Sequence, residues 1–302
     1  MDTAQQYQRE QSATEQALQT QVVKKSGEIV SFDPMKIYRS LKNVGVSDQV
    51  AEIVIRAVVL EVHQGMSTRE IYRKTFALLR KYSRGASVRY RLKDAISQMG
   101  NTGYPFERFV ADLFAEKGYQ VKTGTVIPGR AISHEVDVVA LDSERIFTVE
   151  CKYHVNPSSK SDVKVPMYIL SRYMDIKNRW EGQQEFKDRK YQQWVATNTR
   201  FTDDAIAFAE AYGLRILSWD YPRGASLRDW IQLYGAYPIT CLSCLTKSEK
   251  SLLIAKGLVS CRTIHKNPHL LDKLPLATAK KNLLRRELVY LYDNVLADAE
   301  EP

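Results

Sequence analysis

Residues 136–154 read VDVVALDSERIFTVECKYH, two runs of apolar and β-branched residues separated by the polar residues 142–144. Polar, turn-forming residues between two such runs predict a β-hairpin. The first run contains one acid, Asp137, and the second contains an acid and a base, Glu150 and Lys152. Charges on strands that otherwise look buried need a physical reason, and that reason decides the fold and the function predicted for this chain.

The predicted hairpin brings these three charges together. Residues two apart on a strand share a face, so Glu150 and Lys152 point the same way, while Val149 and Cys151 pack on the other side. The second strand returns beside the first, which places Glu150 opposite Asp137. Two carboxylates without a partner repel each other, and one would be forced to protonate. A hard divalent cation removes this penalty, and Mg²⁺ prefers one or two carboxylates with water and phosphate oxygens.

Lys152 completes a pattern that is typical of phosphodiester hydrolysis. A lysine beside a metal site can orient or deprotonate an attacking water and stabilise the charge that develops on the phosphoryl oxygens. The alternative is an ordinary edge-strand charge pattern, in which an Asp at a strand end is joined by an exposed Glu and Lys. The flanking sequence favours the first interpretation, with Asp137 and Glu150 as metal ligands and Lys152 as a catalytic base or electrophile.

The flanking sequence resembles a known nuclease family. A predicted helix with apolar residues at Phe106, Phe109 and Leu113 precedes the hairpin, and the chain contains the motifs FERFVA, GYQV, HEVDVVA and VECKYH. Through these motifs residues 102–221 resemble the Mrr-type restriction endonuclease branch of the PD-(D/E)XK nuclease superfamily. The resemblance implies a restriction-endonuclease-like α/β core with a central mixed sheet, and double-stranded DNA as substrate. It implies a catalytic set of Asp137, Glu150, Lys152 and the helical acid Glu107, with no secure role for His134 and Glu135.

A second pattern lies near the N-terminus, where residues 22–46 read VVKKSGEIVSFDPMKIYRSLKNVGV. Two β-prone runs flank a Ser-Gly turn, and Asp33-Pro34 opens a helical pattern. Further helices are predicted after Ser47 and after Ser67, whose capping box is completed by Glu70. A third, residues 86–99, ends at a glycine. A hairpin followed by helices forms a small α+β unit.

This unit resembles the ATP-cone, a nucleotide-sensing module. The resemblance rests on VVKKSGEIVSFDPMKI and GASVRYR, and it implies that ATP or dATP is held by Val23, Lys24, Lys25 and Lys36. A triphosphate needs several convergent cations, which these lysines would supply. Ser26 stands where the family frequently has Asp. The alternative is that Lys24 and Lys25 form a solvated face.

Two later segments leave alternatives open. Residues 156–180 are rich in Lys, Arg and Tyr, and they predict either a helix that lays cations along a phosphate backbone or a solvated helix. In the second case Met167, Ile169, Leu170 and Tyr173 turn inward. Residues 223–302 read as short helices joined by turns such as that at Gly257, and resemble helix-hairpin-helix DNA-binding modules; a structural or oligomerising helical cap is the alternative.

Four residues of the C-terminal segment have a spacing similar to that of zinc ligands. Cys241 and Cys244 are separated by two residues, and Cys261 and His265 by three. The surrounding leucines and isoleucine keep these positions within an apolar pattern, which favours small thiols packed in a core.

Composition sets the limits for these interpretations. The chain has 302 residues, enough for two or three domains, and 44 Lys and Arg against 35 Asp and Glu give a formal charge of +9. This excess favours a polyanionic partner. Residues 1–21 are polar, without the apolar core of a signal peptide. The most apolar stretch is interrupted by Glu52, Arg56 and Glu61, so no membrane span and a cytoplasmic protein are expected.

The sequence therefore predicts an α/β multidomain protein with a lead-in at 1–21, an ATP-cone at 22–100, an Mrr-like nuclease domain at 101–222 and a helical domain at 223–302. The predicted function is Mg²⁺-dependent DNA endonuclease activity of the restriction type, in a homo-oligomer that responds to ATP or dATP. The alternative is a nucleotide-sensing DNA-binding regulator in which the nuclease fold is a scaffold.

Overall fold

The computed structural model describes residues 17–24, 26–180 and 189–292. They belong to two compact units, one formed by Met1–Arg91 with Arg286–Pro302 and the other by Leu92–Arg285. Most of the predicted lead-in and the predicted nucleotide ligand Lys25 lie outside the described residues. Among the helices that are described, none combines the length and the apolar character needed to cross a bilayer.

The first unit begins with the predicted hairpin. Strands β1 (Gln21–Val23) and β2 (Ile29–Ser31) pair antiparallel, and Gly27 in the turn has a φ of 86°, which glycine adopts without a steric penalty. The predicted helix starts are confirmed: Ser47 caps one helix, and Ser67 and Glu70 form a capping box on the next. These helices are α2 (Pro34–Lys42), α3 (Asp48–Val59) and α4 (Thr68–Tyr82).

The third predicted helix is broken into two. Helix α5 (Arg84–Tyr90) ends at Arg91, and α6 (Leu92–Ile96) follows in the second unit. Within the first unit, α5 packs closely on the C-terminal part of α13 (Thr278–Tyr292). A Cβ atom at Gly85 would lie 2.6 Å from the carbonyl oxygen of Tyr290, so this contact requires glycine.

The second unit contains a mixed five-stranded sheet, which confirms the predicted central sheet. Its order is β3-β4-β5-β7-β9, with β3, β4 and β5 antiparallel and with β5, β7 and β9 parallel. The predicted hairpin forms β4 and β5. The strand β3 comes before this hairpin in the chain and pairs with β4. The bounds are β3 Gln120–Pro128, β4 Ser133–Leu141, β5 Arg145–Lys152, β7 Lys190–Thr197 and β9 Arg215–Leu217.

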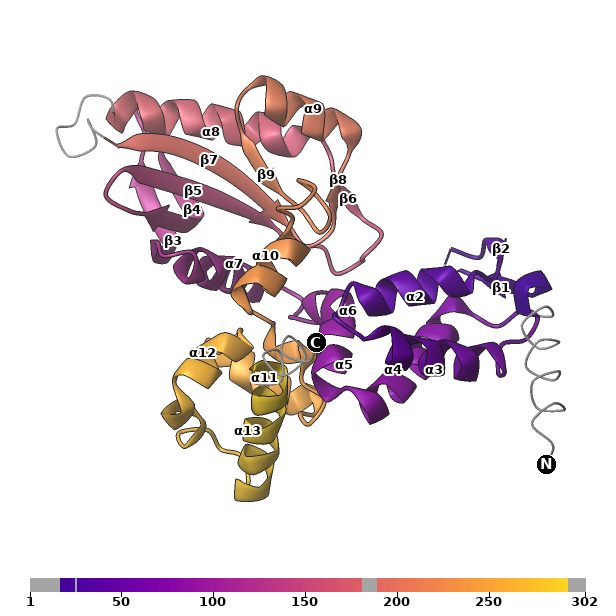
Figure 1. Ribbon diagram of the computed structural model, residues 1–302. Helices are drawn as coiled ribbons and strands as arrows, with labels where there is room; N and C mark the ends of the chain where they lie inside the picture. Colours follow the sequence, from indigo (N-terminus) through magenta and orange to yellow (C-terminus); the bar gives the residue numbers. More distant parts are fainter. Residues whose placement is uncertain (1–16, 25, 181–188, 293–302) are drawn as a thin grey trace, which may run out of the picture. The chain divides into compact units, whose positions relative to one another are not determined.

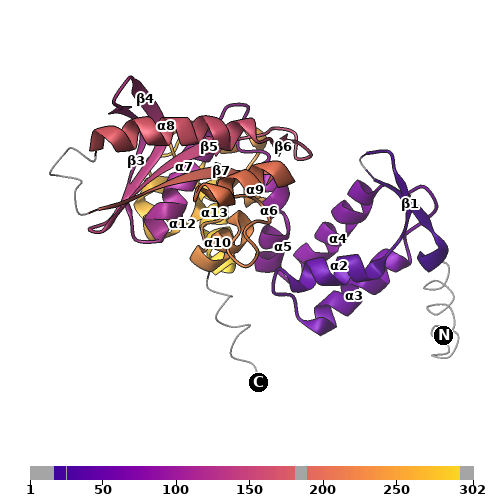
Figure 2. The same ribbon diagram turned by 90° about the horizontal axis from the view of Figure 1, so that it is seen from above.

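Helices cover both faces of this sheet (Figures 1 and 2). On one face lie α7 (Tyr104–Glu116) and α10 (Leu227–Tyr234), where Phe114 contacts the rings of Phe147, Trp194 and Trp230. On the other face lie α8 (Lys164–Trp180) and α9 (Asp203–Ala211), which begins after its N-cap residue Thr202.

Helix α8 corrects one detail of the sequence analysis. Ile169 and Ile176 are fully buried against the sheet, seven residues apart on one helix face, whereas Met167 is 49% exposed. Met167 therefore does not turn inward, because the helix face that meets the sheet passes through Ile169. A short parallel pair, β6 (Lys160–Ser161) with β8 (Arg200–Phe201), lies beside the ends of β5 and β7.

The C-terminal helices of the second unit are α11 (Lys247–Ala255), α12 (Cys261–Lys266) and the start of α13, and α12 and the turn before it contact α7. Thr263 donates a hydrogen bond to Asp112, and the turn at Gly257, whose φ is 78°, lies against the guanidinium of Arg108. Cys241 and Cys261 are buried, in agreement with the core interpretation, whereas Cys244 is only partly buried. Two 3₁₀ turns, Ile239–Cys241 and Pro268–Leu271, complete the described elements.

Candidate functional site

Strand pairing is interrupted at Asp137. The β4–β5 register runs from Leu141 to Val138, opposite Val149, and stops one position before Asp137 would face Glu150. On its other side β4 pairs with β3 at both neighbours of Asp137, and the skipped residue of β3 is Gly124, with a φ of 56°. The register is the same on both sides of this position, so no residue is inserted, and the left-handed backbone of Gly124 interrupts the pairing only locally. The carboxylate of Asp137 then accepts a hydrogen bond of 2.7 Å from the backbone N–H of Cys151.

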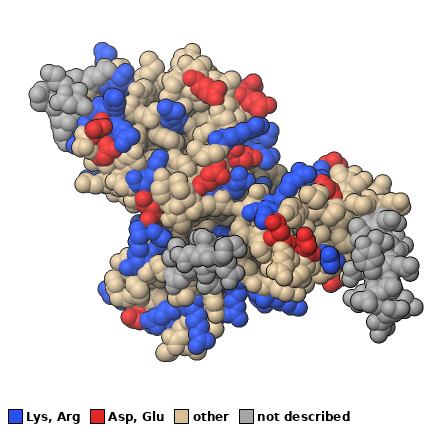
Figure 3. Space-filling model, viewed as in Figure 1, with Lys and Arg blue, Asp and Glu red and all other residues tan. Residues whose placement is uncertain are grey.

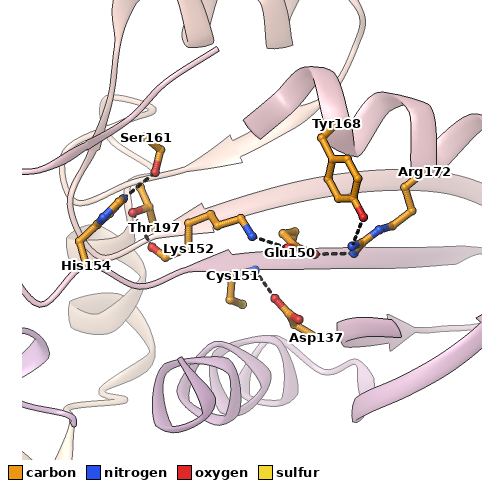
Figure 4. Close-up of polar contacts among 9 residues, drawn as sticks. All are labelled: Asp137, Glu150, Cys151, Lys152, His154, Ser161, Tyr168, Arg172 and Thr197. Carbon is orange, nitrogen blue, oxygen red and sulfur yellow. Dashed lines mark hydrogen bonds and ion pairs between the residues drawn. The ribbon is translucent and has the colours of Figure 1, made fainter. Parts of the chain in front are cut away.

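Glu150 and Lys152 meet as the strand period predicts. The Lys152 Nζ atom lies 2.6 Å from Glu150 Oε1, and the Glu150 side chain is only 7% exposed. Strand β5 pairs with β7 through Lys152, which fixes the backbone at both residues. A second cation approaches from α8, where Arg172 Nη1 lies 2.5 Å from Glu150 Oε2. Both carboxylate oxygens of Glu150 therefore have a cationic partner (Figure 4).

Asp137 reaches the backbone beside Glu150 rather than the Glu150 carboxylate. In Figure 4 its side chain lies on the side of β5 opposite Arg172 and Tyr168, next to Cys151. The structure thus joins Glu150, Lys152 and Arg172 in one row of ion pairs. It places Asp137 at the adjoining peptide. That one ion contacts both carboxylates stays a prediction.

The acids of this region are held in an unfavourable environment for negative charge. Burial and the charge of Glu150 together raise the pKa of Asp137 to about 6, against the lowering effects of the hydrogen bond from Cys151 and the charges of Lys152 and Arg172. Burial, followed by the charges of Asp137 and Glu150, raises the pKa of Glu107 on α7 to about 7. Neighbouring carboxylates whose pKa values rise together indicate charge that a cation would relieve.

The donor set fits a magnesium ion of the kind that nucleotide phosphates help to bind. Across residues 17–24, 26–180 and 189–292 there is no group of three or more His, Cys, Asp or Glu residues arranged to hold a metal. Mg²⁺ does not need one, because it binds through one or two carboxylates and keeps water and substrate oxygens as its other ligands. Asp137 and Glu150 are the carboxylates that would hold such an ion.

A polar network fixes the end of β5 to β7. Thr197 donates a hydrogen bond to the carbonyl oxygen of Lys152, and the amide of Asn198 exchanges two hydrogen bonds with the backbone of His154. The ring of His154 in turn bonds Ser161 on β6. Because these partners are largely buried, they hold the Lys152 backbone rigidly.

The sequence analysis assigned no role to three residues of α8 that lie at or near the site. Arg172 forms an ion pair with Glu150 and also donates a hydrogen bond to the hydroxyl group of Tyr168, one turn earlier. Asp175 bonds His134 and the backbone N–H groups of residues 131 and 132, so it ties the β3–β4 turn to α8. His134 therefore has a structural contact. The spacing of Tyr168, Arg172 and Asp175, which lie at i, i+4 and i+7 of one helix, was the available signal.

The first unit has a cavity of about 260 Å³ beside the hairpin. Lys24 and Lys36, two of the predicted nucleotide ligands, line it, together with Tyr72 and Tyr90, whose rings stack at 5.1 Å. Val23 is not among the lining residues, and its neighbour Val22 takes that place. The strand alternation explains this, because adjacent side chains point to opposite faces.

Comparison with known proteins identifies a family, and the relatives from that family have no assigned function. The model of the family described as AF1548-like, C-terminal, matches residues 237–292. An uncharacterized protein of Archaeoglobus fulgidus is 33% identical over 156 residues, which cover 51% of this chain and 83% of the relative. The crystal structure of AF1548, a protein of unknown function, has a TM-score of 0.51 and 28% identity, and the match covers 65% of this chain and 99% of that one. The MspJI restriction endonuclease in complex with a 27-mer oligonucleotide is 11% identical with a TM-score of 0.30, covering 70% of this chain and 44% of that one.

Proposed function

This chain belongs to the AF1548-like family, and we propose that it is a Mg²⁺-dependent DNA endonuclease of the restriction type. The observation that carries the proposal is the contact between Lys152 and the buried Glu150, beside Asp137 at the point where two strands separate. An ionised carboxylate loses solvation free energy on burial, so a buried acid such as Glu150 needs a cationic partner, either a basic side chain or a metal ion.

The proposed roles follow from chemistry and position. Asp137 and Glu150 would hold the metal, which when bound polarises a phosphoryl oxygen and lowers the pKa of a ligated water. Lys152, with a side chain 38% exposed, can reach a substrate while its backbone is fixed. Its ammonium would orient the attacking water or stabilise the phosphoryl oxygens. Glu107, with a pKa of about 7, is suited to accept or donate a proton near neutral pH.

The surface supports a polyanionic substrate. The net charge of +9 favours double-stranded DNA, and Figure 3 shows Lys and Arg gathered over the visible face of helices α11–α13. We assign this helical segment, residues 223–302, to DNA contact or to assembly of a homo-oligomer. The proposed setting is restriction of foreign or modified DNA in the cytoplasm, by an Mrr-like domain at 101–222.

The cavity of the first unit supports binding of ATP or dATP by an ATP-cone at residues 22–100. Two lysines line it, and the stacked pair Tyr72 and Tyr90 offers aromatic surface to a base. Cations and aromatic rings are the groups that recognise the phosphates and the base of a nucleotide. We expect the nucleotide to regulate activity or assembly.

One observation favours a second candidate, a nucleotide-sensing DNA-binding regulator. Both oxygens of Glu150 already have cationic partners, as they would in a purely structural ion pair. The two candidates differ in whether the chain cuts DNA.

Incubation of supercoiled plasmid with purified protein and Mg²⁺ tests the proposal. Wild type should nick or linearise the plasmid, and Asp137→Ala and Lys152→Ala should reduce the rate by about 100-fold or more. Glu144→Ala, in the exposed turn of the same hairpin, is the matched control and should cut normally. Equal nicking by wild type and both site variants would contradict the proposal, and DNA binding without cutting would favour the regulator.

A further inference from the structure

Arg172 restricts what Glu150 can bind. The carboxylate has two oxygens, and Lys152 contacts one while Arg172 contacts the other. The Arg172 side chain is 11% exposed and that of Glu150 is 7% exposed, so little water competes for either group. A charge-assisted hydrogen bond in such a setting is among the stronger polar contacts in proteins.

Arg172 nevertheless has donors to spare. Its Nε–H is buried and has no hydrogen-bond partner, and Nη2 makes only a long hydrogen bond of 3.4 Å to the hydroxyl of Tyr168. The guanidinium lies 5.1 Å from the centre of the Tyr168 ring, and this tyrosine is 58% exposed. A guanidinium has five N–H donors in a planar fork that matches two oxygens of a phosphate. Arg172 therefore has unused hydrogen-bonding capacity suited to an anion.

Helix α8 sets the position of this arginine. Ile169 and Ile176, one turn on either side, are buried against the sheet, and Asp175 binds the β3–β4 turn through three hydrogen bonds. Arg172 is thus presented to β5 from a fixed helix. Only the side chain needs to move for its partner to change.

We propose that Arg172 is a positioning residue that occupies Glu150 in the absence of substrate and transfers to a phosphodiester oxygen when DNA binds. While it is paired with Glu150 it competes with a divalent cation for Oε2. When a phosphate is present, the guanidinium has a second anionic partner, and Glu150 becomes available to the metal. This inference rests on the proposed nuclease function and adds a coupling between metal binding and substrate binding.

Metal affinity without DNA is the measurement that separates this role from a structural one. Mn²⁺ serves as the probe, by calorimetry and by electron paramagnetic resonance at about pH 8, above the pKa of about 6 of Asp137. Arg172→Gln should bind Mn²⁺ about tenfold more tightly than wild type, the size expected when one charge-assisted competitor is removed. With plasmid present, the same variant should cut more slowly and with a higher KM. Arg179→Gln, an exposed residue of the same helix, should leave both properties unchanged.

Unchanged or weaker Mn²⁺ binding by Arg172→Gln would overturn the inference. If that variant does not fold, Arg172→Lys decides, because a lysine keeps the charge but lacks the fork. Its Mn²⁺ affinity should be higher than that of wild type, and an affinity equal to or below that of wild type would overturn the inference. Failure of the proposed function looks different. In that case Mn²⁺ binding by wild type would be indifferent to Asp137→Asn, whereas failure of this inference alone leaves that dependence intact.

Discussion

The carboxylate of Asp137 accepts a hydrogen bond from the backbone N–H of Cys151, 14 residues later in the chain. The side chain takes over a bond that the β4–β5 ladder no longer makes, because the pairing ends at Val138. Asp137 thus has two tasks. It satisfies a backbone donor at the point where the strands separate, and its negative charge is available beside Glu150.

Asparagine at position 137 separates these two tasks. Asp137→Asn keeps an oxygen that can accept from Cys151 but removes the charge, so the melting temperature should change little while Mg²⁺-dependent cutting falls by about 100-fold or more. Asp137→Ala leaves the N–H without its partner and should be destabilised by about 1–3 kcal/mol. Urea unfolding of both variants checks the difference, and equal stability of Asn and Ala would contradict the structural task.

Raised carboxylate pKa values predict that stability falls as the pH rises. The pKa values of Asp137 and Glu107 in the folded state, about 6 and about 7, lie above those of an unfolded chain. The folded state therefore binds more protons, its advantage is complete below about pH 4, and it is lost as the pH rises through about 6 to 7. Thermal melts should show this loss, and Mg²⁺ should restore part of it at pH 8 and little at pH 5.

Asp112 supplies the control for that experiment. Burial raises its pKa to about 6 as well, but it lies against Thr263 of α12, among no metal-binding carboxylates. Asp112→Asn should reduce the dependence of stability on pH and leave the effect of Mg²⁺ intact. Glu107→Gln should reduce both. If the Asp112 variant loses the stabilisation by Mg²⁺, the cation does not bind at the candidate site.

Asp175 should matter for stability and for the position of Arg172. Asp175→Ala removes the acceptor for His134 and for two backbone N–H groups, so the urea midpoint should decrease. The pKa of Asp175 is lowered, chiefly by His134, so its contribution is present at neutral pH and disappears as the pH falls through the folded pKa. Asp204→Ala, an exposed acid of α9, should not show this loss of stability in acid.

The cavity of the first unit can be tested by ligand-induced stabilisation. ATP or dATP should raise the melting temperature of wild type by binding the folded state alone. Lys24→Ala and Lys36→Ala, which remove lining cations, should abolish most of the shift, while Lys81→Ala, at the exposed end of α4, should retain it. If all three variants show the full increase in melting temperature, the nucleotide binds somewhere other than this cavity.

Local patterns predicted the parts of the fold that depend on neighbours in sequence. The two-residue alternation of side chains along a β-strand correctly predicted that Glu150 and Lys152 share one face. The capping residues correctly predicted where α3 and α4 begin. Arg172 was missed because its partner lies 22 residues away on another element. The actual partner of Asp137 depends on the β4–β5 pairing ending at Val138, and the alternation of residues within the hairpin does not show where the pairing ends.

Helix α7 contacts the C-terminal segment that the family model matches, residues 237–292. Glu107 faces the candidate site, while Arg108, Asp112 and Glu116 of the same helix contact Gly257, Thr263 and Lys266. Removing residues 237–292 would take these partners away from α7 and would expose the buried carboxyl group of Asp112 to water. The segment therefore supports the helix that carries Glu107, and residues 101–222 expressed without it should be less stable than the full chain.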